Sequence, residues 1–167
     1  MPLNPVLVIV DMQNLFLQDH KEAWKISEAC EYINHVAGLL RSQGHPVIHV
    51  QDMEGVSEDT SPEARDIIPE IHVEPGDLRV PKEFSNAFWQ TDLEQVLHEH
   101  KAGLVIIAGF AAEHCVTFTW NGALERGFKA AILHNGICSS QPEAISAIYR
   151  DRQIVSYSVI EYITGVV

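Results

Sequence analysis

The chain has few basic residues and lacks the common phosphate-binding motifs. Eleven Lys and Arg stand against 23 Asp and Glu among 167 residues, which gives a formal net charge of −12. A surface of that sign repels phosphate backbones and anionic lipid head groups, so we expect neither nucleic acid nor a membrane as a partner. No GxGxxG and no GxxxxGK[ST] occurs in the sequence. These absences exclude the dinucleotide fingerprint and the P-loop.

Cysteine is also scarce, and long apolar runs are missing. Cys30, Cys115 and Cys138 form an odd set without a CxxC, so a disulfide framework is not expected. The longest apolar run, residues 104–112, is far shorter than the ~20 residues that span a bilayer. The first residues lack the basic region of a signal peptide. From these features we expect a cytoplasmic protein.

Apolar segments alternate with helical periodicity along the whole chain. A continuous apolar run without alternation predicts a strand that is covered on both faces. Strands alternating with helices predict an α/β fold: a three-layer α/β/α, Rossmann-like arrangement with a mostly parallel central sheet of about six strands. No repeat or internal linker interrupts the pattern, so we expect a single domain over residues 1–167. We predict strands at 5–10, 46–50, 78–81, 128–133 and 154–159, and a further strand that begins at Leu104. We predict a loop at 15–20 and helices over 26–40, 92–101, 115–127 and 142–149, with another helix that begins at residue 62.

Cys115 follows the apolar run that begins at Leu104, at the point where a predicted strand ends and a predicted helix begins. The unpaired N–H groups and the dipole at a helix start favour thiolate over thiol, so this is a position suited to a nucleophile. The alternative is an inert, buried cysteine. Cys30 lies on the apolar stripe of a helix and is predicted to be core, whereas Cys138 lies in a serine-rich stretch that predicts a loop.

Asp11 and Lys82 also follow predicted strands. Ligands of open α/β sheets bind at the carboxyl ends of the strands, so these two residues and Cys115 would converge if their strands were neighbours. The carboxylate would then take the thiol proton and the ammonium would stabilise the anions, while the thiolate attacks an electrophilic carbon. The plainer alternatives are a capping aspartate and an exposed lysine.

These segments together resemble the isochorismatase-like cysteine hydrolases, a superfamily that includes nicotinamidases, N-carbamoylsarcosine amidohydrolase and isochorismatase. The resemblance covers nearly the whole chain. It is carried by Val6-Leu-Val-Ile-Val-Asp-Met-Gln-Asn14, by residues 68–71 and 75–77 with Lys82, by residues 87–88 and 91–93, and by residues 109–116 with Ala123 and Gly127.

The resemblance implies a catalytic role for three residues, with Asp11 as general base, Lys82 as its electrostatic partner and Cys115 as nucleophile. It also implies a cis peptide between Phe110 and Ala111, and an oxyanion hole formed by the backbone N–H groups of Ala111 and Cys115. The reaction implied is hydrolysis of an amide or carbamoyl C–N bond in a small molecule through a thioester. The resemblance also implies a homo-oligomer.

The segment after the second predicted strand departs from the nicotinamidase pattern. Nicotinamidases bind a metal there through an Asp-x-His and further histidines, whereas this chain has Gln51-Asp52-Met53-Glu54 and no histidine before His72. We therefore expect a solvated loop, no metal and no cofactor. Asp52, Glu54 and His72 are the alternative set of metal ligands.

A second departure concerns the predicted substrate pocket. Asn86 stands where many relatives have serine, which changes the hydrogen-bonding groups offered to a substrate. Trp120 is assigned instead to the core, and His114 is expected to be exposed or structural because adjacent helical residues point apart. The predicted pocket residues are Phe16, Gln51, Phe84, Asn86 and Trp89.

Three other functions remain open from the sequence. The first is an isochorismatase-type hydrolase of a small molecule that is not an amide. The second is a non-catalytic family member that binds another protein, in which case Cys115 would be packed and inert. The third is a flavodoxin-like nucleotide binder, which has the same order of strands and helices.

Overall fold

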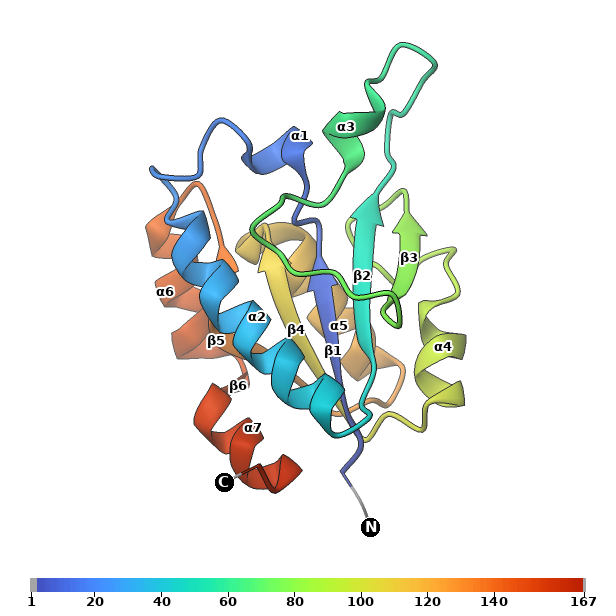
Figure 1. The fold of residues 1–167 in the computed structure, drawn as a ribbon, viewed down its shortest axis with the longest axis vertical. Coiled ribbons are helices and arrows are strands. Elements are labelled where there is room, and N and C mark those ends of the chain that lie inside the picture. The colour runs from blue at the N-terminus through green and yellow to red at the C-terminus, as the bar shows by residue number, and fades with distance from the viewer. Residues whose placement is uncertain (1–2, 167) are drawn as a thin grey trace.

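The computed structural model describes residues 3–166, and within them a six-stranded parallel sheet forms the centre of the fold (Figure 1). The strand order is β3-β2-β1-β4-β5-β6, and each neighbouring pair is parallel. The predicted α/β class with about six mainly parallel strands is confirmed. The strands are β1 (Pro5–Val10), β2 (Val47–Asp52), β3 (Leu78–Lys82), β4 (Leu104–Phe110), β5 (Ala130–Cys138) and β6 (Ile154–Val155).

Helices cover both faces of the sheet, so alternate residues of the central strands enter two separate cores. Leu7 and Ile9 of β1 pack beneath the α2 side, whereas Val6 and Val8 pack with residues of α4, α5 and α6. The longer helices are α2 (Ile26–Ser42), α4 (Leu93–Glu99), α5 (Thr117–Glu125), α6 (Pro142–Asp151) and α7 (Tyr157–Thr164), and α1 (Asn14–Leu17) and α3 (Pro62–Arg65) are single turns. None of the helices in the described residues is both long and apolar enough to cross a membrane.

Three predicted elements were wrong in extent or type. The apolar segment 154–159 is strand only at β6 and then becomes helix α7, because the Ser156 hydroxyl caps the helix by accepting the N–H of Val159. Strand β5 extends through Cys138, which is buried and pairs with Phe110, so Cys138 does not lie in a loop. The first part of the predicted loop, residues 15–17, belongs to helix α1.

The strand order brings the carboxyl ends of β3, β2, β1 and β4 to one edge of the sheet. Gly109 allows the close contact between β4 and β1 there, because its φ is +115° and a Cβ would collide with the Val10 carbonyl oxygen. After β4 the chain forms a π-helical turn, η1 (Ala112–Val116), before α5. Asp11, Asp52, Lys82 and Cys115 therefore share this edge.

Candidate active site

Lys82 lies at the centre of a buried group of charged and nucleophilic side chains. Its Nζ atom is 3.1 Å from Asp11 Oδ2, 3.1 Å from Asp52 Oδ2 and 3.4 Å from Cys115 Sγ. The Lys82 side chain is 0% exposed, so its charge has to be balanced inside the protein. The structure thus brings together the three residues predicted at the strand ends and adds a fourth, Asp52.

Asp11 is held in an unusual backbone conformation directly after β1. Its φ is +55°, a value that non-glycine residues rarely adopt, and its N–H and C=O are bonded to Val50 and Gln13. Burial raises the pKa of Asp11 from 3.8 to about 6, although the Lys82 charge opposes the shift. Asp11 Oδ1 is buried and has no hydrogen-bond partner among the described residues. Asp11 can therefore accept a proton at that oxygen near neutral pH.

Cys115 lies in the π-helical turn rather than in the first turn of a regular α-helix. The turn is closed by the N–H of Val116, which donates to the Ala111 carbonyl oxygen at 3.1 Å. Burial, followed by the nearby Asp11 charge, raises the pKa of Cys115 to about 12. Desolvation is the largest cause of this raised pKa, and it opposes the preference for thiolate that is expected of a helix start. Cys115 is a thiol at neutral pH and needs a base.

Asp52 is the site residue that the sequence does not predict, because the polar segment around it predicts a solvated loop. It ends β2 and its side chain is only 10% exposed. Burial would lower the pKa of Lys82, but Asp11, Cys115 and Asp52 together raise it, so Lys82 stays an ammonium. The signal in the sequence is that Asp52 follows the apolar strand 46–50 by two residues, just as Asp11 follows its own strand.

One group of potential metal ligands occurs among the described residues, and Lys82 lies within it. Atoms of Asp11, Asp52 and Cys115 lie within 4.8 Å of one another. The Lys82 ammonium contacts all three and so takes the place that a cation would occupy. Glu54 and His72, the other two ligands considered from the sequence, are exposed and do not join this group.

The predicted pocket residues divide into two sets. Phe84 and Trp89 are 44% and 52% exposed and line a cavity of about 190 Å³ that also touches Lys82. Phe16 instead packs near Phe110, with ring centroids 5.8 Å apart.

The two predicted polar pocket residues are engaged in local contacts. The Gln51 side chain bonds to Arg79 and to the Arg65 carbonyl. Asn86 accepts the N–H of Phe88 and lies against Gly122. Both side chains therefore make contacts within the protein.

The remaining predicted features lie near Cys115 in the sequence. The Phe110–Ala111 peptide is cis, at the position that the family resemblance implies. The His114 side chain is 66% exposed, and Trp120 is buried in the core.

The family of the chain follows from its sequence. A model of the isochorismatase domain matches residues 5–154. The chain belongs to the isochorismatase family. An uncharacterized isochorismatase family protein of Bacillus subtilis, YaaI, is 31% identical over 148 residues, which are 82% of this chain and 82% of that protein.

Solved structures of the isochorismatase-like fold resemble this chain over almost its full length. The N-carbamoylsarcosine amidase of Thermoplasma acidophilum gives a TM-score of 0.76 at 22% identity, covering 92% of this chain and 95% of its own. A cysteine hydrolase from Pseudomonas syringae pv. phaseolicola gives 0.82 at 19% identity, covering 99% and 94%. Because both sequences are less than 25% identical to this chain, the comparison shows that the fold is shared.

Proposed function

We propose that this isochorismatase-family protein is a cysteine-dependent hydrolase of a small amide or carbamoyl compound. The observation that carries the proposal is the position of the Lys82 Nζ atom, in contact with both the Asp11 carboxylate and Cys115 Sγ. A buried lysine in contact with two carboxylates and a half-buried thiol is costly as mere packing and useful as a reaction centre. The similarity to an N-carbamoylsarcosine amidase favours a C–N bond as the one cleaved.

The first half of the reaction forms a thioester. Asp11 removes the proton from Cys115 as Sγ bonds to the substrate carbonyl carbon, and the carbonyl electrons move to oxygen. Lys82 stabilises the sulfur anion as it forms. When the C–N bond breaks, the nitrogen takes the proton from Asp11 and leaves as ammonia or an amine. The N–H groups of Ala111 and Cys115 are the proposed donors to the oxyanion.

The second half releases the acid product. Asp11, again a carboxylate, removes a proton from water while the water oxygen bonds to the thioester carbon. The C–S bond then breaks and Sγ recovers the proton from Asp11. The raised pKa of Asp11, about 6, suits a group that must both accept and return a proton near neutral pH.

The test is a screen of small primary amides and N-carbamoyl compounds for release of ammonia or amine. We expect Cys115→Ala to abolish turnover and to remove the acyl adduct that intact-protein mass spectrometry detects in rapidly quenched wild type. His114→Ala is the matched control, because His114 is the exposed neighbour of the nucleophile. Wild-type turnover in Cys115→Ala that retains its far-UV circular dichroism would overturn the mechanism. Turnover of a substrate without C–N cleavage would instead support the non-amide alternative.

A further inference from the structure

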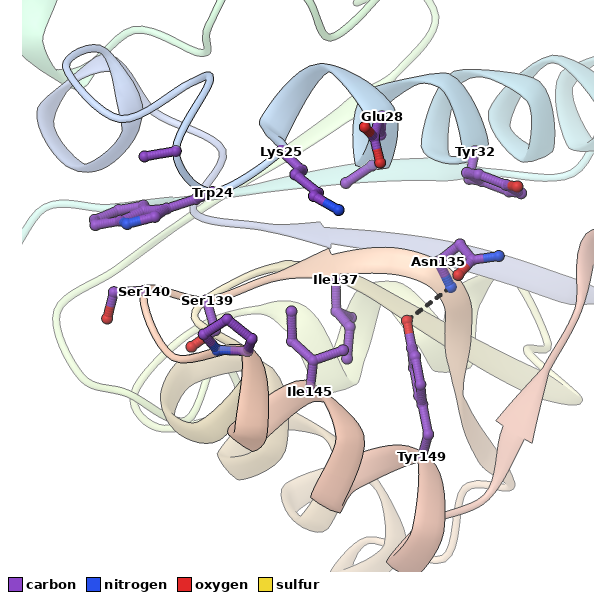
Figure 2. Close-up of a pocket in the computed structure, with 13 residues that line it drawn as sticks. Trp24, Lys25, Glu28, Tyr32, Asn135, Ile137, Ser139, Ser140, Ile145 and Tyr149 are labelled. Atoms are coloured by element: carbon purple, nitrogen blue, oxygen red, sulfur yellow. Dashed lines mark hydrogen bonds between the residues drawn. The ribbon is translucent and has the colours of Figure 1, made fainter.

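A second cavity of about 390 Å³ lies between the start of α2, the second half of β5 and α6 (Figure 2). Its size is within the range of small-molecule sites. Of the described residues, Asp11, Asp52, Lys82 and Cys115 all lie outside its walls. It is therefore distinct from the candidate active site, and a ligand bound in this cavity would not depend on the proposed function.

The cavity exists because the sheet is incomplete on one side of β5. Strand β6 pairs only with Ile132 and Leu133. From residue 134 onward, β5 has no strand neighbour on that side among residues 3–166, and α2 and α6 stand apart across this unpaired edge (Figure 2). A concave space with walls from three elements remains there.

The walls combine an apolar middle with polar ends. Ile137 of β5 and Ile145 of α6 form the middle (Figure 2). Trp24 closes one end, and its ring is held in place by stacking on His20 at 3.9 Å and on Phe110 at 5.7 Å between centroids. A rigid aromatic wall beside aliphatic side chains suits a flat or short apolar group.

Two polar residues face each other across this space, and both have a left-handed backbone. Lys25 has a φ of +53° and Asn135 a φ of +65°. The N–H of Asn135 donates to the Tyr149 hydroxyl at 2.8 Å, which fixes that end of the cavity. Within the described residues, Lys25 makes no ion pair and the Asn135 side chain makes no hydrogen bond. The cavity wall thus carries the ammonium of the exposed Lys25 and the amide of Asn135, neither with a protein partner among the described residues.

We propose that this cavity is a binding site for a small organic carboxylate with an apolar ring or chain. Figure 2 shows Lys25 extending from the start of α2 toward β5, whereas the Glu28 carboxylate stays close to its own helix. The ligand carboxylate pairs with the Lys25 ammonium, and its apolar part lies between Trp24 and the two isoleucines. Asn135 supplies a donor and an acceptor for a polar substituent at the far end.

The test uses benzoate and benzylamine as probes of the same shape and opposite charge, titrated by isothermal calorimetry. We expect benzoate to bind in preference to benzylamine. Lys25→Met should weaken benzoate binding by about three- to tenfold, because it removes a charge-assisted contact at a partly open site. Glu28→Gln should leave it unchanged or strengthen it. Lys21→Met is the matched control, because Lys21 lies on the same segment, pairs with Glu70 and does not line the cavity.

Amide shifts in nitrogen-edited NMR spectra then locate the bound probe. Shifts centred on Trp24, Lys25 and Asn135 would support the proposal. Shifts centred on Cys115 would overturn it, as would an affinity for benzoate unaffected by Lys25→Met. Stronger binding of benzylamine, or binding of neither probe at millimolar concentration, would also overturn it.

Discussion

Gln13 joins the ends of two neighbouring strands through the main chain of Asp52. Its Oε1 accepts the Asp52 N–H at 2.8 Å, and its Nε2 donates to the Asp52 carbonyl at 3.1 Å. Gln13 is 0% exposed, so water cannot replace these bonds. We predict that Gln13→Met lowers the free energy of unfolding by about 2 to 4 kcal/mol, because two buried backbone groups lose their partner.

Urea denaturation measures this loss, and the nearby exposed Gln18 provides the control. Gln18→Met should stay within about 0.5 kcal/mol of wild type. Equal stability of both variants would show that the Gln13 bonds do not hold the strand ends together.

The Asp11 charge makes Cys115 less acidic, whereas the proposed mechanism uses the same carboxylate as the base. Its negative charge contributes to the raised pKa of the Cys115 thiol. We predict that Asp11→Asn increases the alkylation rate of Cys115 by iodoacetamide at a pH of about 8, because Lys82 stays beside the sulfur and the opposing charge is gone. The same variant should lose at least about a hundredfold in hydrolysis.

Peptide mass spectrometry gives the alkylation rate of Cys115 separately from those of Cys30 and Cys138, which are buried. Asp19→Asn, at an exposed position, should match wild type in both assays. Slower alkylation in Asp11→Asn would mean that Asp11 promotes thiolate formation in the resting protein, contrary to the prediction.

The shared edge of Asp11, Lys82 and Cys115 could be predicted because parallel strands have a polarity. Asp11 directly follows β1, Lys82 ends β3 and Cys115 lies in the turn after β4. The sheet order β3-β2-β1-β4 places those strand ends at one edge. The acidity of Cys115 could not be predicted, because it depends on how far the turn is buried. A helix start lowers the pKa of a thiol only where solvent or a nearby cation compensates for the cost of burying the thiolate.

Asp52 and α7 show what apolar patterning leaves out. Strand β2 continues for two polar residues beyond its apolar run, and those polar residues predict a loop at Asp52. The segment 154–159 is rich in β-branched residues, yet the cap at Ser156 and the burial of Ile160 select a helix. Both outcomes are decided by tertiary contacts that a single sequence does not display.

The fall of kcat/KM at acid pH, the acid limb of the pH profile, should follow the protonation of Asp11. Because the Asp11 carboxylate is the proposed base and its pKa is about 6, kcat/KM should fall about tenfold per pH unit below that value. The Asp52 charge contributes to raising the pKa of Asp11, so Asp52→Asn should move the limb to lower pH. Glu54→Gln, two residues further along and exposed, should leave the limb in place. A limb unmoved in Asp52→Asn would rule out electrostatic coupling between the carboxylates.

The ionisation of Asp11 should also make the free energy of unfolding depend on pH. Burial raises the pKa of Asp11 from 3.8 in the unfolded chain to about 6, so the folded chain binds this proton more tightly. The contribution of Asp11 to the free energy of unfolding is therefore greatest below the unfolded pKa and declines as pH rises through the folded pKa, by about 3 kcal/mol. Asp11→Asn has no proton to lose there. Urea unfolding of both proteins between pH of about 4 and about 7 measures this effect. As pH rises, the wild type should lose stability relative to Asp11→Asn. A difference independent of pH would mean that Asp11 titrates at its ordinary value when folded.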